Sequence, residues 1–508
     1  MPVIFMNTSP DARDENARLA RMLFWVLLSG VAAGLILPLT YALAGRQDGD
    51  GMLTALISTR RLTWYFWEQD RFLNLIPALT KVFKAPDTNL HAQVFLRACM
   101  TYLSPLAILV FFTRSTRTLL LSIAIANIVL IASLPFYGWF NLYVQHNPFG
   151  ISLVLFALAY LLMSPSSPLS VLRLLVAGLL CLLAYATNFA LLVFTGPLLF
   201  LLMVFRPEAR RRLFGFGVLN AAAIVGAFLH SKSMKMQVTQ FGVAPSLDSL
   251  QQATDVLYKL LNVPVFLSLL ALTLICLATL SLAREHRRSL VLGLSVPLIS
   301  ALVMALALSM SVWVKMNGFN VRYFLTAEIA VATVMAYLIA MRLEQAQLGA
   351  IRLGLMLVSI YAVLVFGPMG GITDTYKELI SEDRRVQSKA IAQAAVETRS
   401  TVIAGDFWDV WPVVYETQRL RADQQSPLPI FGAAERASAL GKEFRKQAEG
   451  GAEQGMLCFL PTVDACTTEI RKRLQLMPQI RFEIGAVKTV TLADKQMLDI
   501  RFRLSRGD

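Results

Sequence analysis

The chain has 508 residues, of which 56% are hydrophobic and 16% are charged, whereas soluble proteins carry about 25% charged residues. This composition excludes a soluble enzyme and indicates a polytopic membrane protein. Residues 1–369 carry 27 Lys and Arg against 14 Asp and Glu, and residues 370–508 carry 20 against 19. The net charge of +14 therefore belongs to the membrane half, where it meets anionic lipid, and it requires no nucleic-acid partner.

A transmembrane helix needs about 20 mostly apolar residues, and eleven such runs precede residue 370. The first run is expected to be a retained helix, because it is too long for a signal peptide and no small-residue cleavage pattern follows it. The predicted spans are residues 20–44, 93–113, 117–137, 146–163, 169–187, 188–205, 212–230, 262–283, 289–311, 323–342 and 349–368. The sequence thus predicts a transmembrane domain over 1–369 and a soluble domain over 370–508.

The loops between the spans predict the orientation. RSTR (114–117), RPEARRR (206–212) and REHRR (284–288) are dense in Arg, whereas the alternate loops FNLYVQHNP and ATN have no Lys or Arg. By the positive-inside rule the N-terminus is cytoplasmic. An odd number of spans then places the C-terminal domain outside, which in a bacterial cytoplasmic membrane is the periplasm.

The first outer loop, 45–92, is long and combines aromatic with acidic residues. GMLTALI and FLNLIPALTKVF are too short to span and predict short interfacial helices. Between them, WEQDR places Glu68 and Asp70 about 200° apart if the segment is helical and on one side if it is extended. A single carboxylate at the mouth of a membrane cavity suits a general base, and Asp70 is favoured because Arg71 adjoins it. The alternative is that EQDR is the polar face of an interfacial helix.

A second candidate site is WVKMNGFNVRYFL, in the outer loop before the tenth span. Arg322 and Lys315 lie at the predicted outer boundary beside aromatic residues, and Arg matches phosphate geometry in a bidentate manner. The alternative is that both are interfacial anchors whose charged ends reach the aqueous surface. Glu328 falls inside the following span, where ionisable groups are usually functional or paired.

The C-terminal segment predicts an α/β domain. TVIAGDFW, PLPIFGA and GMLCFLP are strand candidates, VWPVVYETQRLRAD and ERASALGKEFRKQAE are helical, and IRFEIGAVKTVTL with QMLDIRFRLS predicts a hairpin. In GDFWDVWP, Trp408 could stack on a sugar ring while Asp406 and Asp409 accept its hydroxyl hydrogen bonds. The alternative is a structural turn in which Asp409 caps the helix.

The five cysteines divide by domain. Cys99, Cys181 and Cys276 fall in spans and are expected to be inert packing residues. Cys458 and Cys466 fall in the domain predicted to lie in an oxidising space, so they are candidates for a disulfide; the alternative is two unrelated buried thiols. No metal-spaced Cys/His cluster, Walker motif or GxGxxG occurs in the sequence.

Together these features resemble the GT-C superfamily of membrane glycosyltransferases, which includes lipid A aminoarabinose transferases and protein O-mannosyltransferases. WEQDRFLNLIPAL resembles the first-loop acidic motif of that family, whose carboxylate is the catalytic base; this maps onto Asp70, with Glu68 as second choice. VRYFL resembles the Arg-Tyr motif that opens a late span, where the Arg holds the lipid phosphate; this maps onto Arg322. The Asp-Glu pair of some members is absent, so a divalent metal is not supported.

The resemblance implies an inverting glycosyltransferase. The donor would be a polyprenyl-phosphate sugar and the acceptor a hydroxyl of a glycan, lipid or protein, with no cofactor required. Arg322 and Lys315 would stabilise the leaving phosphate, and Trp67 and Tyr323 would line the sugar pocket. Two alternatives are an O-antigen polymerase or ligase and a lipid-linked saccharide flippase; the absence of internal repeats and the large outer domain are unlike a transporter.

Overall fold

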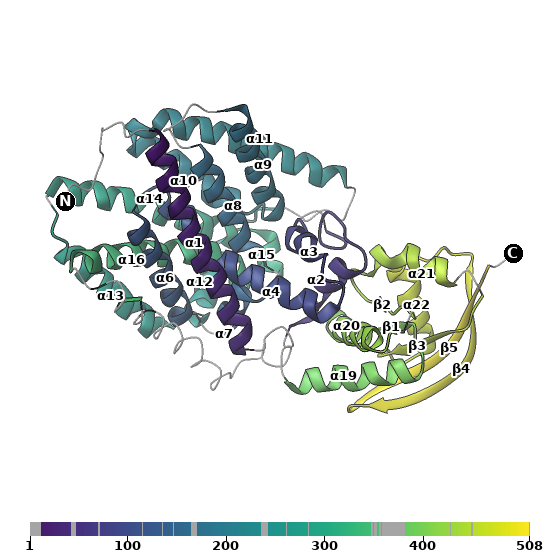
Figure 1. The fold of residues 1–508 in the computed structure, drawn as a ribbon. Helices are drawn as coiled ribbons and strands as arrows, with labels where there is room; N and C mark the ends of the chain where they lie inside the picture. Colours follow the sequence, from purple (N-terminus) through teal and green to yellow (C-terminus); the bar gives the residue numbers. More distant parts are fainter. Residues whose placement is uncertain are drawn as a thin grey trace. The chain divides into compact units, whose positions relative to one another are not determined.

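The computed structural model describes residues 12–506 with interruptions, the longest of which is 358–381 (Figure 1). The other residues outside the description are 42–46, 70–71, 114, 135, 146, 164–169, 235–241, 261, 283, 347–348, 350–352, 355–356, 427 and 449–450. The chain forms two compact units. The helical unit comprises Met1–Thr40, Arg71–Leu73 and Phe95–Ile372, and the α/β unit comprises Tyr41–Asp70, Asn74–Val94 and Thr373–Asp508.

Apolar helices make up the helical unit. Its elements are α1 (Ala12–Tyr41), α4 (Pro86–Leu103), α5 (Leu106–Leu109), α6 (Thr116–Ser133), α7 (Phe136–Tyr143), α8 (Phe149–Leu162), α9 (Val171–Thr187), α10 (Leu191–Phe205), η2 (Pro207–Ala209), α11 (Arg210–Ser233), α12 (Leu247–Leu260), α13 (Val263–Thr279), α14 (Arg284–Ser309), α15 (Val312–Met316), η3 (Val321–Tyr323) and α16 (Leu325–Gln345). The first turns of α4 belong to the α/β unit.

Within the described residues, five helices are long and apolar enough to cross a membrane. They are Pro86–Leu109, Thr116–Ser133, Pro207–Ser233, Ser289–Ser309 and Leu325–Gln345, and shorter apolar helices are Ala20–Leu35, Phe149–Leu162, Val171–Thr187, Leu191–Phe205 and Val263–Thr279. Each overlaps a predicted span, and the last predicted span, 349–368, lies almost entirely outside the described residues. The structure is thus that of a helical membrane protein with a C-terminal α/β domain.

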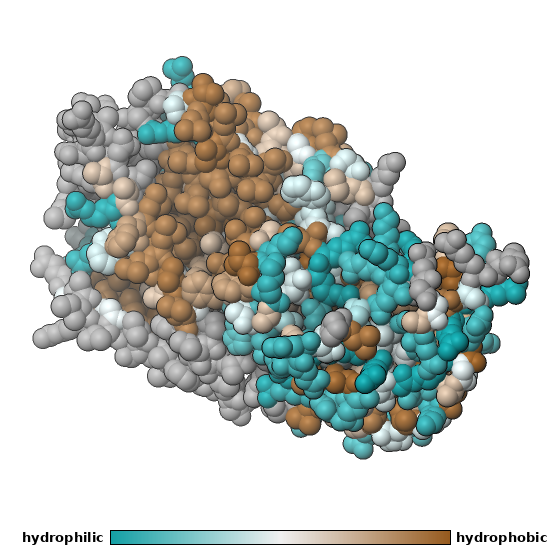
Figure 2. Space-filling view, turned by 45° about the vertical axis from the view of Figure 1, so that its right-hand side comes forward, coloured by the Kyte–Doolittle hydropathy of each residue, from teal (hydrophilic) through white to brown (hydrophobic). Residues whose placement is uncertain are grey.

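The helices of this unit differ in what surrounds them. In its most apolar stretch, Leu325–Gln345 is 83% buried whereas Pro207–Ser233 is 28% buried, so α16 is central, against α6 and α14, and α11 is peripheral. Large apolar side chains such as Phe24 (59% exposed) and Leu229 (61% exposed) face outward. Figure 2 shows such surface as a broad brown area on the helical unit. Exposed apolar area on this scale is stable in lipid rather than in water.

A mixed five-stranded sheet forms the core of the α/β unit (Figure 1). The strand order is β2-β1-β3-β5-β4, in which β1 pairs in parallel with β2 and β3, and β5 pairs antiparallel with β3 and β4. The strands are β1 (Val402–Ala404), β2 (Phe431–Ala433), β3 (Gln454–Cys458), β4 (Ile480–Leu492) and β5 (Lys495–Arg506), and the helices of the C-terminal segment are α19 (Glu382–Glu397), α20 (Phe407–Asp423), η5 (Ala437–Leu440), α21 (Gly441–Ala448) and α22 (Val463–Arg473). Each predicted strand and helix of this segment overlaps one in the structure, although β1 covers only the first part of TVIAGDFW and the helix predicted over 435–449 is divided into η5 and α21; α19 and α22 were not predicted.

The first loop contributes two short helices to the same unit, α2 (Gly49–Thr59) and α3 (Leu75–Thr80). The sequence predicts short helices here, but places the loop with residues 1–369 and its apolar faces in the membrane interface. In the structure α2 packs against α20, and Leu53, Leu56 and Ile57 are fully buried. The C-terminal domain therefore takes up this apolar face, a long-range contact that local hydropathy cannot reveal.

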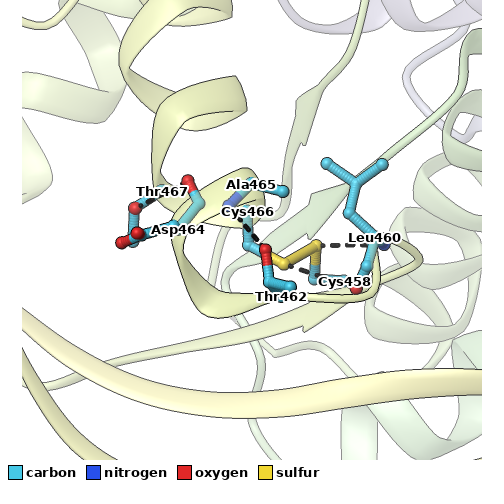
Figure 3. Close-up of a disulfide and its surroundings, with 7 residues drawn as sticks. All are labelled: Cys458, Leu460, Thr462, Asp464, Ala465, Cys466 and Thr467. Carbon is cyan, nitrogen blue, oxygen red and sulfur yellow. Dashed lines mark hydrogen bonds between the residues drawn. A yellow bond between two sulfur atoms is a disulfide. The ribbon is translucent and has the colours of Figure 1, made fainter.

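The predicted disulfide is present at the end of β3. Cys458, the last residue of β3, is bonded to Cys466 in α22, with the Cα atoms 6.1 Å apart (Figure 3). Thr462 starts α22 between them, because its hydroxyl accepts a hydrogen bond from the Ala465 amide (3.2 Å). The bond therefore fixes the start of α22 to the sheet.

We expect Cys458 and Cys466 to be bonded in protein isolated from cells. Closing a loop of this size stabilises the unit by about 2–3 kcal/mol in the chain-entropy description, so reduction should lower its melting temperature. Alkylation of unreduced protein followed by mass spectrometry measures the pairing, and Cys99, Cys181 and Cys276 serve as internal free-thiol controls. Full labelling of both thiols would contradict the bond and the extracytoplasmic placement, because a cytosolic domain would keep them reduced.

Candidate functional site

The acidic motif of the first loop lies on a segment closed by Asn74. Its side-chain amide donates to the carbonyl oxygens of Tyr65 (2.6 Å) and Thr63 (3.1 Å), and its backbone amide donates to the carbonyl of Trp64 (2.8 Å). The two ends of the segment 64–74 are therefore tied together. Asp70, the predicted base, lies outside the described residues.

Glu68 binds the turn that follows β2. One carboxylate oxygen accepts a hydrogen bond from the Arg436 amide (3.0 Å) and the other from the Ser438 amide (2.8 Å). The backbone is left-handed at both Glu68 (φ 57°) and Arg436 (φ 75°), a conformation that non-glycine residues adopt only where surrounding contacts compensate. Because both oxygens of Glu68 accept backbone hydrogen bonds, the geometry favours a structural role for Glu68 over that of a general base.

Two arginines before the motif make further contacts with the C-terminal segment. Arg60 donates to the carbonyl of Ile430, lies 4.8 Å from the centre of the Phe431 ring and pairs with Glu443 at 3.6 Å. Burial lowers the pKa of Arg60, and the Glu443 carboxylate opposes that shift. Arg61 donates to another carbonyl of the same region. Sequence reasoning missed both residues; the only local signal was an Arg pair on a loop predicted to lie outside, against the positive-inside rule.

Trp67 does not form an open sugar platform. It is fully buried, its ring meets Trp411 of α20 edge-on at 5.9 Å, and its Nε1 donates to the Arg61 carbonyl (3.1 Å). The prediction that Trp67 lines a sugar pocket is therefore replaced by a packing role. Trp64 is the exposed aromatic of this stretch, at 67%.

In GDFWDVWP both carboxylates make structural contacts within the α/β unit. Asp406 caps α20 by accepting from the Trp408 amide (2.9 Å), so the cap is Asp406 and not Asp409. Asp409 accepts from Lys495 Nζ (2.6 Å) and from Arg384 Nη2 (3.1 Å). Trp408 is half-buried beside Phe407. This geometry favours the structural interpretation of the motif over sugar binding by these three residues.

The second candidate site, in the helical unit, is a group of hydrogen-bond donors just before α16. Asn320 precedes η3 and caps it, because its side chain accepts from the Arg322 amide (3.1 Å). The Tyr323 hydroxyl oxygen accepts from Trp313 Nε1 (2.9 Å) and from Arg322 Nη2 (3.2 Å), and the Arg322 guanidinium lies 5.2 Å from the Tyr323 ring centre. With its oxygen accepting twice, Tyr323 can direct its own proton at an anion.

Lys315 and Glu328 flank this donor group in the sequence. Lys315 lies exposed on α15, and no described contact joins it to Arg322. Glu328 lies in the first turn of α16, and both of its carboxylate oxygens are buried without a hydrogen-bond partner among the described residues. Such a group is costly in an apolar environment, which makes Glu328 a candidate for a functional role.

The described residues contain no group of three or more His, Cys, Asp or Glu that could hold a metal ion. The candidate side chains are the donors Arg322, Tyr323 and Lys315 and the acceptor Glu328, and the sequence adds Asp70 as a predicted acceptor. No family model and no curated protein matches the chain.

Proposed function

We propose that the protein is a GT-C-like membrane glycosyltransferase, which moves a sugar from a polyprenyl-phosphate donor to a hydroxyl acceptor at the outer face of the bacterial cytoplasmic membrane. In this proposal eleven helices span the membrane, the N-terminus is cytoplasmic and the C-terminal domain is periplasmic. The Arg-dense alternate loops support the orientation. The Cys458–Cys466 bond supports it as well, because disulfides persist in oxidising compartments.

The donor group before α16 is the observation that carries the proposal. A polyprenyl phosphate leaves as an anion, so its departure needs charge stabilisation and no proton donor. Arg322 supplies a fixed positive charge with a planar set of N–H donors, and Tyr323, held through Trp313, supplies an O–H. Lys315 adds a mobile charge at the exposed side.

Asp70 acts on the acceptor in this mechanism. Its carboxylate takes the proton of the acceptor hydroxyl, and the acceptor oxygen forms a bond to the anomeric carbon on the face opposite the phosphate. The bond from that carbon to the phosphate oxygen breaks, and polyprenyl phosphate leaves with the electron pair. Because attack and departure occur on opposite faces, the anomeric configuration inverts.

Glu328 favours a second candidate function, a transporter of lipid-linked saccharides. A buried carboxylate inside a span is a common element of proton and ion relays. In that case Glu328→Gln would stop movement of a fluorescent lipid-linked sugar between the leaflets of a proteoliposome. No sugar would be transferred, and Asp70→Asn would have little effect.

The decisive experiment uses the full-length protein in lipid nanodiscs. Undecaprenyl phosphates carrying single hexoses, aminopentoses or N-acetylhexosamines are supplied as donors, and a total bacterial envelope extract serves as the acceptor source. Mass spectrometry follows release of undecaprenyl phosphate and the mass gained by the acceptor. Turnover that depends on protein with at least one donor supports a transferase, and no release with any donor would refute it.

A further inference from the structure

β4 lies at an edge of the sheet in the α/β unit, with β5 on one side and no strand on the other within the described residues (Figure 1). It has 13 residues, and residues 483–489 are all exposed even though α19 touches the strand. β2, at the other edge, has three residues, all of them buried. β4 is therefore the long open edge of this sheet, and such an edge presents backbone N–H and C=O groups that a further strand can bind.

A bulge in the middle of β4 sets which of its side chains share a face of the sheet. Ile484 lies opposite Phe502 of β5. Three residues on, Val487 lies opposite Ile500, which is only two residues from Phe502. Because residues two apart on a strand point to the same face, Ile484 and Val487 share a face. They are 40% and 42% exposed, so they form an uncovered apolar pair.

Two opposite charges flank this apolar pair on the other face. Glu483 lies opposite Arg503 of β5. Lys488 lies opposite Asp499, four residues from Arg503, so Glu483 and Lys488 share that face by the same rule. Both side chains are exposed. The segment 483–488 reads EIGAVK, and its order of acid, apolar, two small residues, apolar and base is complementary to its own reverse.

We infer that β4 is a homodimerisation surface, on which the free edges of two copies of the chain pair antiparallel about a two-fold axis at the bulge. A two-fold interface is self-complementary, because every contact it contains occurs twice. With the axis between residues 485 and 486, Ile484 lies opposite the partner's Val487. Glu483 lies opposite the partner's Lys488, and the reverse pairs form at the same time. Main-chain hydrogen bonds along the two strands supply affinity, and these side chains supply specificity.

The charges specify the register of this pairing. Opposite charges that face each other across two strands strengthen their association, and like charges weaken it. A shift by two residues in either direction separates Glu483 from the partner's Lys488, and in one direction it sets Arg481 opposite the partner's Lys488. The competing interpretation is that the bulge and Lys488 keep a free edge unpaired. Reversing the charges distinguishes the two interpretations, because a free edge has no partner strand to repel.

The first test reverses the charges in full-length protein in detergent, where sedimentation equilibrium gives the dimer dissociation constant. Glu483→Lys and Lys488→Glu each place like charges opposite each other at both ends of the pairing. We expect each to raise the dissociation constant about 10- to 100-fold, and the double variant Glu483→Lys/Lys488→Glu to return it to within about threefold of the wild type. Lys472→Glu on α22 and Asp494→Lys at the hairpin turn, both exposed, are the matched controls and should leave it unchanged.

Cysteine cross-linking in isolated membranes tests the register without introducing any repulsion. Each charge reversal also meets a like charge on β5, so this second test decides where a reversal disturbs folding. Directly opposed residues have Cα atoms about 4.5–5.5 Å apart, which suits a disulfide, so Glu483→Cys/Lys488→Cys should form a covalent dimer on mild oxidation. In either single variant the two copies of the new cysteine lie about 15 Å apart along the strands, and the chain should stay monomeric on a denaturing gel.

The results have opposite meanings for the two interpretations. Weaker association in both reversals, its return in the double reversal and cross-linking of the double-cysteine variant support the pairing. A wild type that stays monomeric at the highest concentration reached, with no cross-linking, would overturn it and leave β4 a protected free edge. A dimer that is unaffected by the reversals, or that cross-links equally in the single-cysteine variants, would also overturn it, because its contact lies elsewhere. None of these measurements depends on sugar transfer.

Discussion

Replacing Asp70 by Asn is expected to lower turnover by about 100- to 10,000-fold, the usual contribution of a general base, while leaving expression and donor binding unchanged. The base is needed only as the acceptor loses its proton, so the ground-state complex with the donor does not depend on it. Asn has nearly the same shape as Asp and keeps hydrogen-bonding capacity, which limits structural side effects. Turnover and binding of the undecaprenyl-phosphate sugar are measured on the same nanodisc preparation.

Asp255→Asn is the matched control for this experiment. Asp255 lies exposed on α12, in another predicted outer loop, and its replacement is the same chemical change. It should retain wild-type turnover. Near-normal turnover of Asp70→Asn would remove Asp70 as the base.

Replacing Arg322 by Ala is expected to weaken donor binding and to slow turnover by about 100- to 1,000-fold, the range seen when a group that stabilises transition-state charge is removed. Arg322→Lys should restore part of the loss, because it returns the charge without the planar pair of donors. The Tyr323 hydroxyl keeps its hydrogen bond from Trp313 in either variant, so the site should stay assembled. Binding of undecaprenyl phosphate alone, followed by native mass spectrometry, measures the phosphate contribution separately from the sugar.

Arg211→Ala provides the control for the loss of a cation, since Arg211 is exposed at the start of α11. Unchanged phosphate affinity and turnover in Arg322→Ala would make Arg322 an interfacial anchor and would place the phosphate site elsewhere. Weakened binding with unchanged kcat would mean that Arg322 binds the ground state and the transition state equally.

Local patterns were sufficient to predict the five strands and the helices α20 and α21 of the C-terminal segment, but not α19 or α22. The hairpin of β4 and β5 follows from two alternating stretches separated by Ala493 and Asp494, and the structure has both turn residues at positive φ, as tight hairpin turns require. The disulfide could also be predicted, because Cys458 and Cys466 are only eight residues apart in sequence. Each of these features depends on residues close together in sequence.

The parts of the site that sequence reasoning missed depend on distant residues. The sequence ranks Glu68 second to Asp70, but it does not reveal that the Glu68 carboxylate binds the amides of Arg436 and Ser438. Trp67 is one of four consecutive aromatic residues, 64–67. The sequence pattern does not show which of the four packs against Trp411. The sequence offers Asp409 as the cap of its helix, whereas in the structure Asp406 is the cap and Asp409 pairs with Lys495 and Arg384.

The docking of the first loop on the C-terminal domain has a consequence for biosynthesis. Ser438 is 370 residues beyond Glu68, and at about 5–20 residues per second its synthesis follows by about 20–70 seconds. During that interval the apolar side of α2 and the Trp67 ring have no protein to cover them. A bilayer surface can shelter short apolar helices, so we expect this loop to bind the membrane surface until the C-terminal domain has been made. Truncated chains that end before residue 400 should therefore leave it adsorbed to lipid and open to protease.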